Sequence, residues 1–227
     1  MNVLEASEVT KVYSIEDRQI PVVDRVSLSV GESEFLVVQG QSGSGKTTLL
    51  SLLSGLDRPT SGRVRVLGRD ITDLAEDDLA PLRNETIGFV FQAFHLVPSL
   101  TAAENVRFPA ELRRDPEASA KADRLLRRVG LGERGGNFPH QLSGGEKQRV
   151  AICRALINAP RIVFADEPTG NLDSANGRAI LDLLLDLHRE HRTTLLLATH
   201  SAEIAALADR VITLQDGKIA DEKPHAA

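Results

Sequence analysis

The segment from residue 40 to residue 47 constrains the fold of this chain more than any other part of its sequence. It reads Gly-Gln-Ser-Gly-Ser-Gly-Lys-Thr and matches the phosphate-loop pattern G-x-x-x-x-G-K-[ST] at every fixed position. It follows a continuous apolar run, residues 35–38, which is typical of a strand buried on both faces, and it precedes a helical stretch at 47–56. This order of strand, glycine-rich loop and helix predicts a mainly parallel α/β fold that binds the phosphates of a nucleoside triphosphate.

Each part of the loop has a physical task in phosphate binding. Its glycines let successive backbone N–H groups point at the phosphates, and the helix N-terminus adds a partial positive charge. A Gly/Ser linker with a chance lysine is the alternative, but such a match arises in roughly one chain in a hundred of this length. We expect ATP to contact Gly40, Gln41, Ser42, Gly43, Ser44, Gly45, Lys46, Thr47 and Thr48, with Lys46 at the β- and γ-phosphates and the Thr47 hydroxyl on Mg²⁺.

Two carboxylates follow a second apolar run. Asp166 and Glu167 come directly after residues 162–165, and ligands of open α/β sheets bind at the carboxyl ends of the strands. Asp166 is suited to hold Mg²⁺, and Glu167 is then placed to orient and polarise an attacking water. Without the phosphate loop, an ordinary acidic turn before Pro168 would explain the pattern equally well.

The rest of the chain alternates between strand and helix patterns. Helical periodicity occurs at 118–129, 150–156 and 180–187, and β-branched or alternating runs predict extra antiparallel strands near the N-terminus. Asp216 and Gly217 predict a hairpin between strands at 211–214 and 218–220, and we expect the tail from Asp221 to Ala227 to fray. The other predicted strands are 5–12, 22–30, 63–67, 87–91 and 193–198.

Composition excludes several classes of protein. The chain of 227 residues has 27 Lys and Arg against 32 Asp and Glu, so a broad nucleic-acid-binding face is not expected. A single cysteine, Cys153, excludes an internal disulfide and is expected to be a small buried hydrophobe. The longest apolar run has five residues, and residues 1–17 lack the features of a signal peptide, so we expect a cytoplasmic location.

A second glycine-rich string, residues 142–149, reads Leu-Ser-Gly-Gly-Glu-Lys-Gln-Arg and comes just before the helix at 150–156. Ser143 is placed to cap that helix, and the two glycines permit close approach to an anion. With this string the sequence resembles the ABC-type ATPases, the nucleotide-binding cassettes that power ABC transporters. The resemblance extends from Leu4 to about Ile219 and keeps the motifs of the family in order.

The resemblance implies roles for individual residues. Tyr13 matches the aromatic residue that stacks on adenine, although an ordinary strand tyrosine is the alternative. Gln92 matches the glutamine that contacts Mg²⁺ and the water and senses the membrane partner. His200 matches the switch histidine on the γ-phosphate, and Asp173 belongs to the loop between two nucleotide sites. The signature residues Ser143, Gly144, Gly145 and Glu146 would contact ATP bound to the opposite subunit, while His95, His140, His188, His191 and His225 match no such role.

The resemblance also implies an architecture and partners. It predicts one domain over 1–227, with a RecA-like P-loop NTPase core at about 1–92 and 146–227, an N-terminal antiparallel β subdomain, and an α-helical subdomain at about 93–145. Two copies would pair head to tail around two ATP, peripheral on the inner face of the cell membrane. The helical subdomain and the Gln92 region would contact an integral membrane permease. A groove for a permease helix could be lined by Phe94, Leu96, Val97 and Leu100, although we expect at least half of these four to belong to the core of the subdomain instead.

Within the family, three strings resemble cassettes of the lipoprotein-release and macrolide-exporter class, namely residues 55–62, 94–106 and 166–173. Three alternatives stay open at this point. A P-loop kinase or GTPase would leave residues 142–149 and His200 unexplained. A soluble ABC ATPase of DNA repair or translation shares every motif, although those usually carry two cassettes or a long coiled coil. An importer cassette is the third, but only 27 residues follow His200, and many importer cassettes carry a C-terminal regulatory domain.

Overall fold

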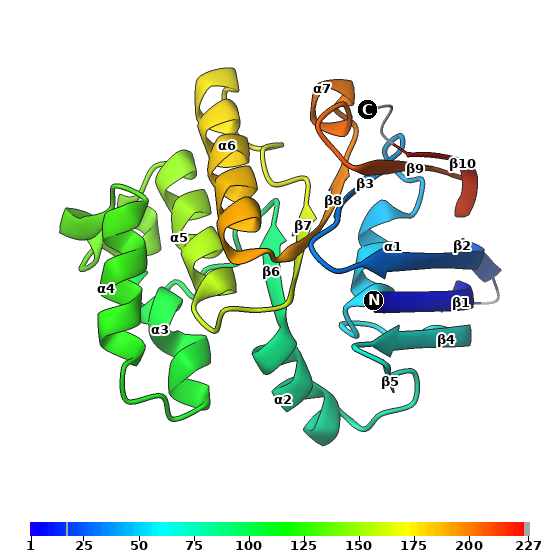
Figure 1. The fold of residues 1–227 in the computed structure, drawn as a ribbon, viewed down its shortest axis with the longest axis horizontal. Coiled ribbons are helices and arrows are strands. Elements are labelled where there is room, and N and C mark those ends of the chain that lie inside the picture. Colours follow the sequence, from blue (N-terminus) through cyan, green and yellow to red (C-terminus); the bar gives the residue numbers. More distant parts are fainter. Residues whose placement is uncertain (17, 225–227) are drawn as a thin grey trace.

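A six-stranded sheet forms the centre of the computed structural model, which describes residues 1–16 and 18–224 (Figure 1). Its strands lie in the order β10-β9-β3-β8-β7-β6, and only β10 runs antiparallel to its neighbour. Strands β7 and β8 are buried along their whole length, as their continuous apolar sequences predict. The strands are β3 (Phe35–Gln39), β6 (Ile87–Phe91), β7 (Ile162–Asp166), β8 (Thr194–Thr199), β9 (Arg210–Gln215) and β10 (Lys218–Pro224).

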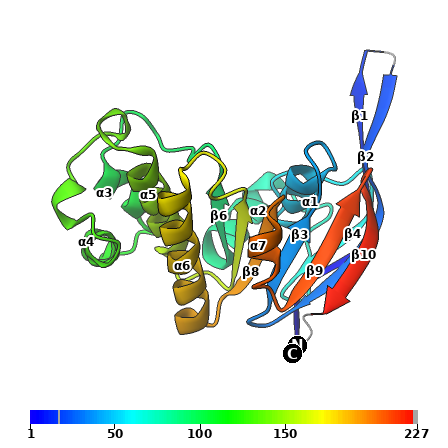
Figure 2. The same ribbon diagram turned by 90° about the horizontal axis from the view of Figure 1, so that it is seen from above.

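A second, antiparallel sheet packs beside the first, in the order β2-β1-β4-β5. It consists of β1 (Asn2–Ile15), β2 (Arg18–Gly31), β4 (Ser61–Val66) and β5 (Arg69–Asp70). The predicted strands at 5–12 and 22–30 are therefore the central parts of two longer strands. Figure 2 shows that the far end of the β1–β2 hairpin extends beyond the body of the molecule.

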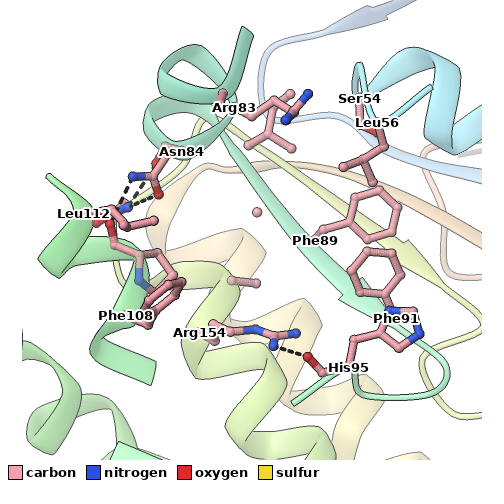
Figure 3. A pocket seen from close by; sticks show the side chains of 16 residues that line it. Ser54, Leu56, Arg83, Asn84, Phe89, Phe91, His95, Phe108, Leu112 and Arg154 are labelled. Carbon is pink, nitrogen blue, oxygen red and sulfur yellow. Dashed lines mark hydrogen bonds between the residues drawn. The ribbon is translucent and has the colours of Figure 1, made fainter. Parts of the chain in front are cut away.

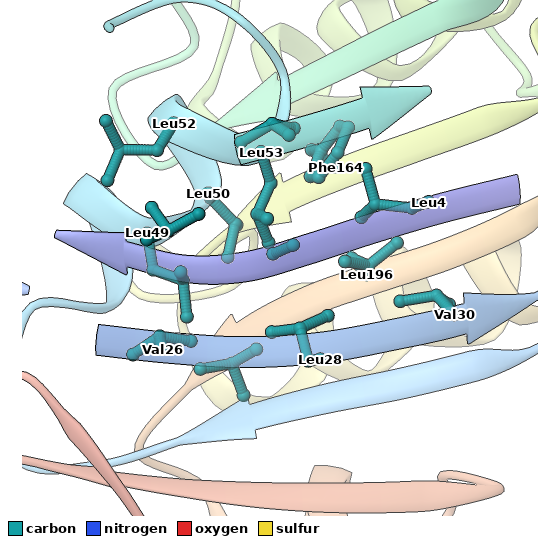
Figure 4. Close-up of a cluster of buried hydrophobic side chains, with 14 of the residues drawn as sticks. Leu4, Val26, Leu28, Val30, Leu49, Leu50, Leu52, Leu53, Phe164 and Leu196 are labelled. Atoms are coloured by element: carbon teal, nitrogen blue, oxygen red, sulfur yellow. The ribbon is translucent and has the colours of Figure 1, made fainter. Parts of the chain in front are cut away.

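Helix α1 (Lys46–Leu53), which the phosphate loop opens, lies between the two sheets. Leu49, Leu50 and Leu53 are fully buried there and pack with residues of both sheets (Figure 4). The helix ends three residues earlier than the expected Leu56, because Gly55 has φ +69 and terminates it in the left-handed conformation.

The opposite face of the central sheet is covered by α5 (Gly144–Leu156), α6 (Ser174–His191) and α7 (Ala202–Ala205). Alternation along β3 divides its residues between the two layers: Leu36 and Val38 face α1, while Phe35 and Val37 face the α6 side. The inner strands are therefore covered on one face by α1 and the second sheet and on the other by α5, α6 and α7, which leaves their ends accessible.

Three further helices are α2 (Glu76–Thr86), α3 (Ala102–Leu112) and α4 (Ala118–Arg128). Short 3₁₀ turns at Gly132–Arg134 and Pro139–Gln141 lead from α4 to α5. A separate apolar cluster joins α3, α4 and α5, and it includes Cys153, which is 1% exposed. The prediction that Cys153 is buried is confirmed.

The C-terminal tail differs from the expectation. Residues 221–224 do not fray but pair with β9, from Asp221 opposite Thr213 to Pro224 opposite Arg210. An ion pair of 2.6 Å between Arg210 and Glu222 ties the two strands together. Residues 225–227, and with them His225, lie outside the described residues. Over the described ranges, none of the helices combines the length and apolar character needed to cross a membrane.

Candidate active site

The phosphate loop connects β3 to α1 at the carboxyl edge of the central sheet. Two of its positions accept only glycine, because Gly45 has φ +101 and a Cβ there would lie 2.5 Å from the carbonyl oxygen of Val22. A Cβ on Gly40 would likewise lie 2.5 Å from the carbonyl oxygen of Leu214. The loop is thus packed tightly against β2 on one side and β9 on the other.

Lys46 is buried, and its ammonium group is held by the loop itself. Nζ donates to the carbonyl oxygens of Gly40 and Gln41 at 2.9 and 3.0 Å, and it lies 3.8 Å from Oε1 of Glu167. These contacts hold the positive charge at a pocket of about 590 Å³ in front of the loop. The pocket is lined by Val22, Gln41, Ser42, Gly43, Gly45, Lys46, Thr47, Thr48, Gln92, Glu167 and His200.

Asp166, at the end of β7, supplies a site suited to a hard cation. Its Oδ2 accepts a hydrogen bond of 2.8 Å from the Thr47 hydroxyl, while its buried Oδ1 has no hydrogen-bond partner among the described residues. Burial, with a smaller effect of the neighbouring Glu167 carboxylate, raises the pKa of Asp166. A divalent cation here would satisfy the free oxygen and offset the cost of burying the charge, so these residues fit Mg²⁺.

Gln92 follows β6 and opens onto the same pocket. Its Nε2 lies 3.4 Å from Oδ1 of Asn171, and its carbonyl oxygen accepts a 2.9 Å hydrogen bond from Nδ2 of Asn171. Of the predicted metal residues, Thr47 and Gln92 therefore line the pocket, and Asp166 is hydrogen-bonded to Thr47. Asn171 fixes the segment that carries Gln92.

Glu167 follows Asp166 directly and is fixed in a strained conformation. Its φ of +43 is uncommon for a residue with a side chain, and its backbone N–H donates to the Ala198 carbonyl at 3.0 Å. Nδ1 of His200 lies 3.0 Å from Oε1, and the Thr199 hydroxyl donates to Oε2 at 3.3 Å. The end of β8 thus aims the carboxylate into the pocket. Thr199 was not predicted from the sequence, although a hydroxyl next to His200 at a strand end is an available signal.

The signature residues lie away from this pocket, at the N-terminus of α5. Ser143 and Glu146 cap the helix reciprocally, with the Glu146 N–H donating to the Ser143 hydroxyl at 3.3 Å and the Ser143 N–H donating to Glu146 at 2.8 Å. A Cβ on Gly145 would come within 2.9 Å of Asn176, so α5 packs closely on the start of α6. Ser143 is exposed, and no residue from 143 to 146 lines the pocket of its own chain.

Asp173 and Tyr13 also lie outside the pocket lining. Asp173 caps α6, where its Oδ1 accepts from the Asn176 N–H at 3.0 Å. Tyr13 lies on the protruding part of β1, partly exposed, and its hydroxyl donates to Oδ2 of Asp57 at 2.8 Å.

A second hollow, of about 350 Å³, lies between α2, β6, α3 and α5 (Figure 3). Phe89, Phe91 and Phe108 supply much of its apolar wall, and Arg154 donates from α5 to the carbonyl oxygens of Phe94 and His95 at its rim. The expected groove residues do not line this hollow. Leu96 packs against the cluster of α3, α4 and α5 instead, and the lining residues do not include Phe94, Val97 or Leu100.

Comparison with known proteins agrees with this geometry. The family described as "ABC transporter" matches residues 23–170. The chain is 48% identical, over 99% of its length, to a macrolide export ATP-binding/permease protein MacB of Rhodospirillum rubrum, but covers only 35% of that protein. It is 45% identical to MJ1508 of Methanocaldococcus jannaschii, an uncharacterized ABC transporter ATP-binding protein, and covers 98% of it. The chain therefore spans about a third of the length of the exporters that it matches and nearly all of MJ1508.

Among solved structures, the dimeric ATP-binding cassette MJ0796 in a post-hydrolysis state with ADP and Pi superposes with a TM-score of 0.93. The identity is 39%, and the alignment covers 99% of both chains. The chain therefore shares its fold with the cassette MJ0796 and much of its sequence with MJ0796 and MJ1508. This chain belongs to the ABC transporter family, as one of its ATP-binding cassettes.

Proposed function

We propose that this chain binds ATP with Mg²⁺ in the phosphate-loop pocket and hydrolyses it, and that a pair of such cassettes drives a membrane permease. The position of the Glu167 carboxylate carries the proposal. The carboxylate points into the phosphate pocket, 3.8 Å from the Lys46 ammonium and 3.0 Å from His200. There it would contact a water in line with the γ-phosphate.

Hydrolysis then requires positioning and charge neutralisation rather than covalent chemistry. Lys46 and the N–H groups of the loop bind the β- and γ-phosphates, and Glu167 orients and polarises the water. His200, anchored by Glu167, is placed to donate to the γ-phosphate. Mg²⁺, when bound by Thr47, Gln92 and Asp166, supplies further neutralisation of the phosphate oxygens.

A head-to-tail homodimer completes the site. None of Ser143, Gly144, Gly145 and Glu146 lines the pocket of its own chain, and Ser143 is exposed at a capped helix N-terminus, which suits binding of a phosphate held by another copy. The dimeric cassette MJ0796, with its ADP and Pi, supports this arrangement. In such a dimer of this chain, the loop that carries Asp173 would lie between the two sites.

The hollow beside Gln92 is the proposed contact with the permease. Its apolar wall suits a short amphipathic helix, and Arg154 links it to the turn after Gln92. The MacB-type relatives carry a permease in the same chain, as their names state, which supports work of the macrolide-export or lipoprotein-release type at the inner face of the membrane. Residues 93–145 would be the subdomain that faces the permease.

A co-purification experiment tests this proposal. Tagged Glu167→Gln would be isolated from detergent-solubilised membranes with ATP and Mg²⁺, next to Lys46→Ala as a variant that does not bind nucleotide. A stoichiometric membrane protein that is enriched only with Glu167→Gln is the expected result. Recovery of a soluble homodimer alone, or of ribosomes or nucleic acid, would instead favour a soluble ABC ATPase.

A further inference from the structure

Two charged residues, Asp57 and Lys11, hold Tyr13 in place. Neither of them lines the nucleotide pocket. The Tyr13 hydroxyl donates to Oδ2 of Asp57 at 2.8 Å, and Nζ of Lys11 lies 4.9 Å from the centroid of the Tyr13 ring. Lys11 in turn donates to Oδ1 of Asp57 at 2.6 Å, which closes a triangle of contacts around the phenol. The ring is therefore fixed at its edge by the carboxylate and covered on one face by the ammonium group.

Asp57 is also tied to α1, the helix that the phosphate loop opens. It lies just beyond the end of α1, where its N–H donates to the Ser51 carbonyl at 3.1 Å. Lys11 donates to the carbonyl oxygen of Arg58 at 2.7 Å, and the Thr60 N–H donates to the Thr10 carbonyl at 2.8 Å. The segment 56–60 thus joins the helix opened by the phosphate loop to the strand that carries Tyr13.

The electrostatics of the cluster agree with a fixed arrangement. Burial alone would raise the pKa of Asp57, but hydrogen bonds from Lys11, Tyr13 and the Arg58 N–H outweigh it and hold the pKa below its usual range. Burial, and then the contact with Asp57, raise the pKa of Tyr13, with Thr48 acting in the opposite direction. The Lys11 side chain is only 13% exposed, so this pair is shielded more than a surface ion pair, which contributes little.

We propose that Asp57, assisted by Lys11, is a positioning residue that fixes the Tyr13 ring and thereby sets the affinity of the site for the base of the nucleotide. The inference rests on the proposed ATP binding and on the role in stacking on adenine that the family resemblance implies for Tyr13. A ring that is already immobilised loses less conformational freedom when a base stacks on it. Because Asp57 follows α1, it also fixes the distance between the base and the phosphate loop.

The composition of the chain provides a selective probe. Tyr13 is the only tyrosine and there is no tryptophan, so tyrosine fluorescence and tyrosinate absorbance report on this ring alone. The affinities of ATP and of inorganic tripolyphosphate, which has no base, would be measured for the wild type, Asp57→Asn and Lys11→Met. Asp115→Asn is the matched control, since Lys121 and Asp115 form a comparable pair, 2.5 Å long, in the helical region.

For Asp57→Asn we expect ATP affinity to fall about three- to tenfold, a part of the full contribution of base stacking, with tripolyphosphate affinity unchanged. The tyrosinate titration should move to lower pH, because the carboxylate no longer opposes ionisation of Tyr13. Lys11→Met should also lower the affinity for ATP but not that for tripolyphosphate. Both affinities of Asp115→Asn should match those of the wild type. A partly unfolded variant would lose both ligands equally, so the ratio of the two affinities isolates the effect on the base.

Three results would overturn the inference. If Tyr13→Ala weakens ATP selectively but Asp57→Asn leaves the ratio of affinities unchanged, Asp57 has no positioning role and the stacking role of Tyr13 stands. If Tyr13→Ala itself leaves the ratio unchanged, the proposed stacking role fails, and the inference with it. Equal weakening of both ligands in Asp57→Asn, with thermal unfolding at the wild-type temperature, would show that Asp57 only supports the phosphate loop, which also contradicts the inference.

Discussion

At the scale of single residues, the carboxylate of Glu167 offers the sharpest test of the chemistry. Glu167→Gln keeps the size of the side chain and its contacts with Thr199 and His200 but removes the negative charge. We expect turnover to fall at least about a hundredfold, as for loss of a general base, while ATP binds as well as before or more tightly. Phosphate release and nucleotide affinity would be measured together, and hydrolysis near the wild-type rate would remove Glu167 from its role.

Cys153 gives a prediction for pH dependence. Burial raises the pKa of its thiol to about 12, whereas a thiol in an unfolded chain ionises near about 8.5. The folded chain therefore keeps a proton that the unfolded chain loses. The free energy of unfolding should fall above about pH 8.5, by up to about 1.4 kcal/mol per pH unit from this group.

Comparing denaturant unfolding of the wild type and Cys153→Ala across this pH range isolates the effect of the thiol from that of other groups. A thiol reagent should label Cys153 only when the chain unfolds. Rapid labelling of the native protein would contradict the burial of this side chain.

The residues expected to bind phosphate, Mg²⁺ and the attacking water could be predicted from the sequence, because each motif places them at the end of a strand or the start of a helix. Asp166 and Thr47 are 119 positions apart, yet both motifs predicted one shared cation site, which the 2.8 Å hydrogen bond between them agrees with. The supporting residues were not predictable in this way. The contact of Asp57 with Tyr13 joins separate segments through ordinary residues, so local pattern carries no signal for it. Thr199 is marked only by its place next to His200 at the end of β8.

At the scale of elements, the turn between β9 and β10 braces the phosphate loop. The Gly217 N–H donates to the Ser44 carbonyl at 3.1 Å, and its carbonyl accepts from the Asp24 N–H at 2.9 Å. Gly217 has φ +76, and a Cβ there would lie 2.5 Å from the carbonyl oxygen of Val22, the same oxygen that Gly45 approaches. Gly217→Ala should therefore lower both nucleotide affinity and stability, the latter by about 3 kcal/mol from strain and overpacking.

Two further variants separate backbone strain from the steric clash. Gly68 has φ +79 with open space around it, so Gly68→Ala should cost only about 1 kcal/mol and leave nucleotide affinity unchanged. Gly217→Asn tolerates the left-handed conformation but still has a Cβ, so it should not restore binding. Thermal unfolding and ATP titration would measure both effects, and equal behaviour of Gly217→Ala and Gly68→Ala would argue against bracing.

The elements themselves were predictable to different degrees. Buried strands and amphipathic α4 and α6 follow directly from hydrophobic pattern, but α2 and α3 do not, since each has an internal proline, Pro81 or Pro109, and α2 buries only Leu79. Strand order and the pairing of residues 221–224 depend on contacts between distant segments, which periodicity does not encode.

At the scale of the whole molecule, α5 connects the parts of the cassette. Its N-terminus carries the signature, Ile152 packs on the sheet side, Val150 packs in the helical cluster, and Arg154 holds the turn after β6. A ligand bound at the N-terminus of α5 would therefore act on a single rigid helix that reaches the hollow beside Gln92. A second copy of the chain would supply that ligand, as ATP bound in its own pocket. The proposed function therefore depends on this second copy.

Complementation between two inactive variants tests this arrangement. Lys46→Ala removes phosphate binding, and Ser143→Arg blocks the signature while leaving the pocket of its own chain intact, so each homodimer should be inactive. A mixed dimer contains one site with both an intact Lys46 and an intact Ser143. An equimolar mixture should therefore recover roughly a quarter of the wild-type hydrolysis, because random pairing makes half of the dimers mixed and each has one working site of two. Unchanged ATP binding by Ser143→Arg is the control for folding, and a mixture no more active than its separate components would show that the signature does not act across the dimer.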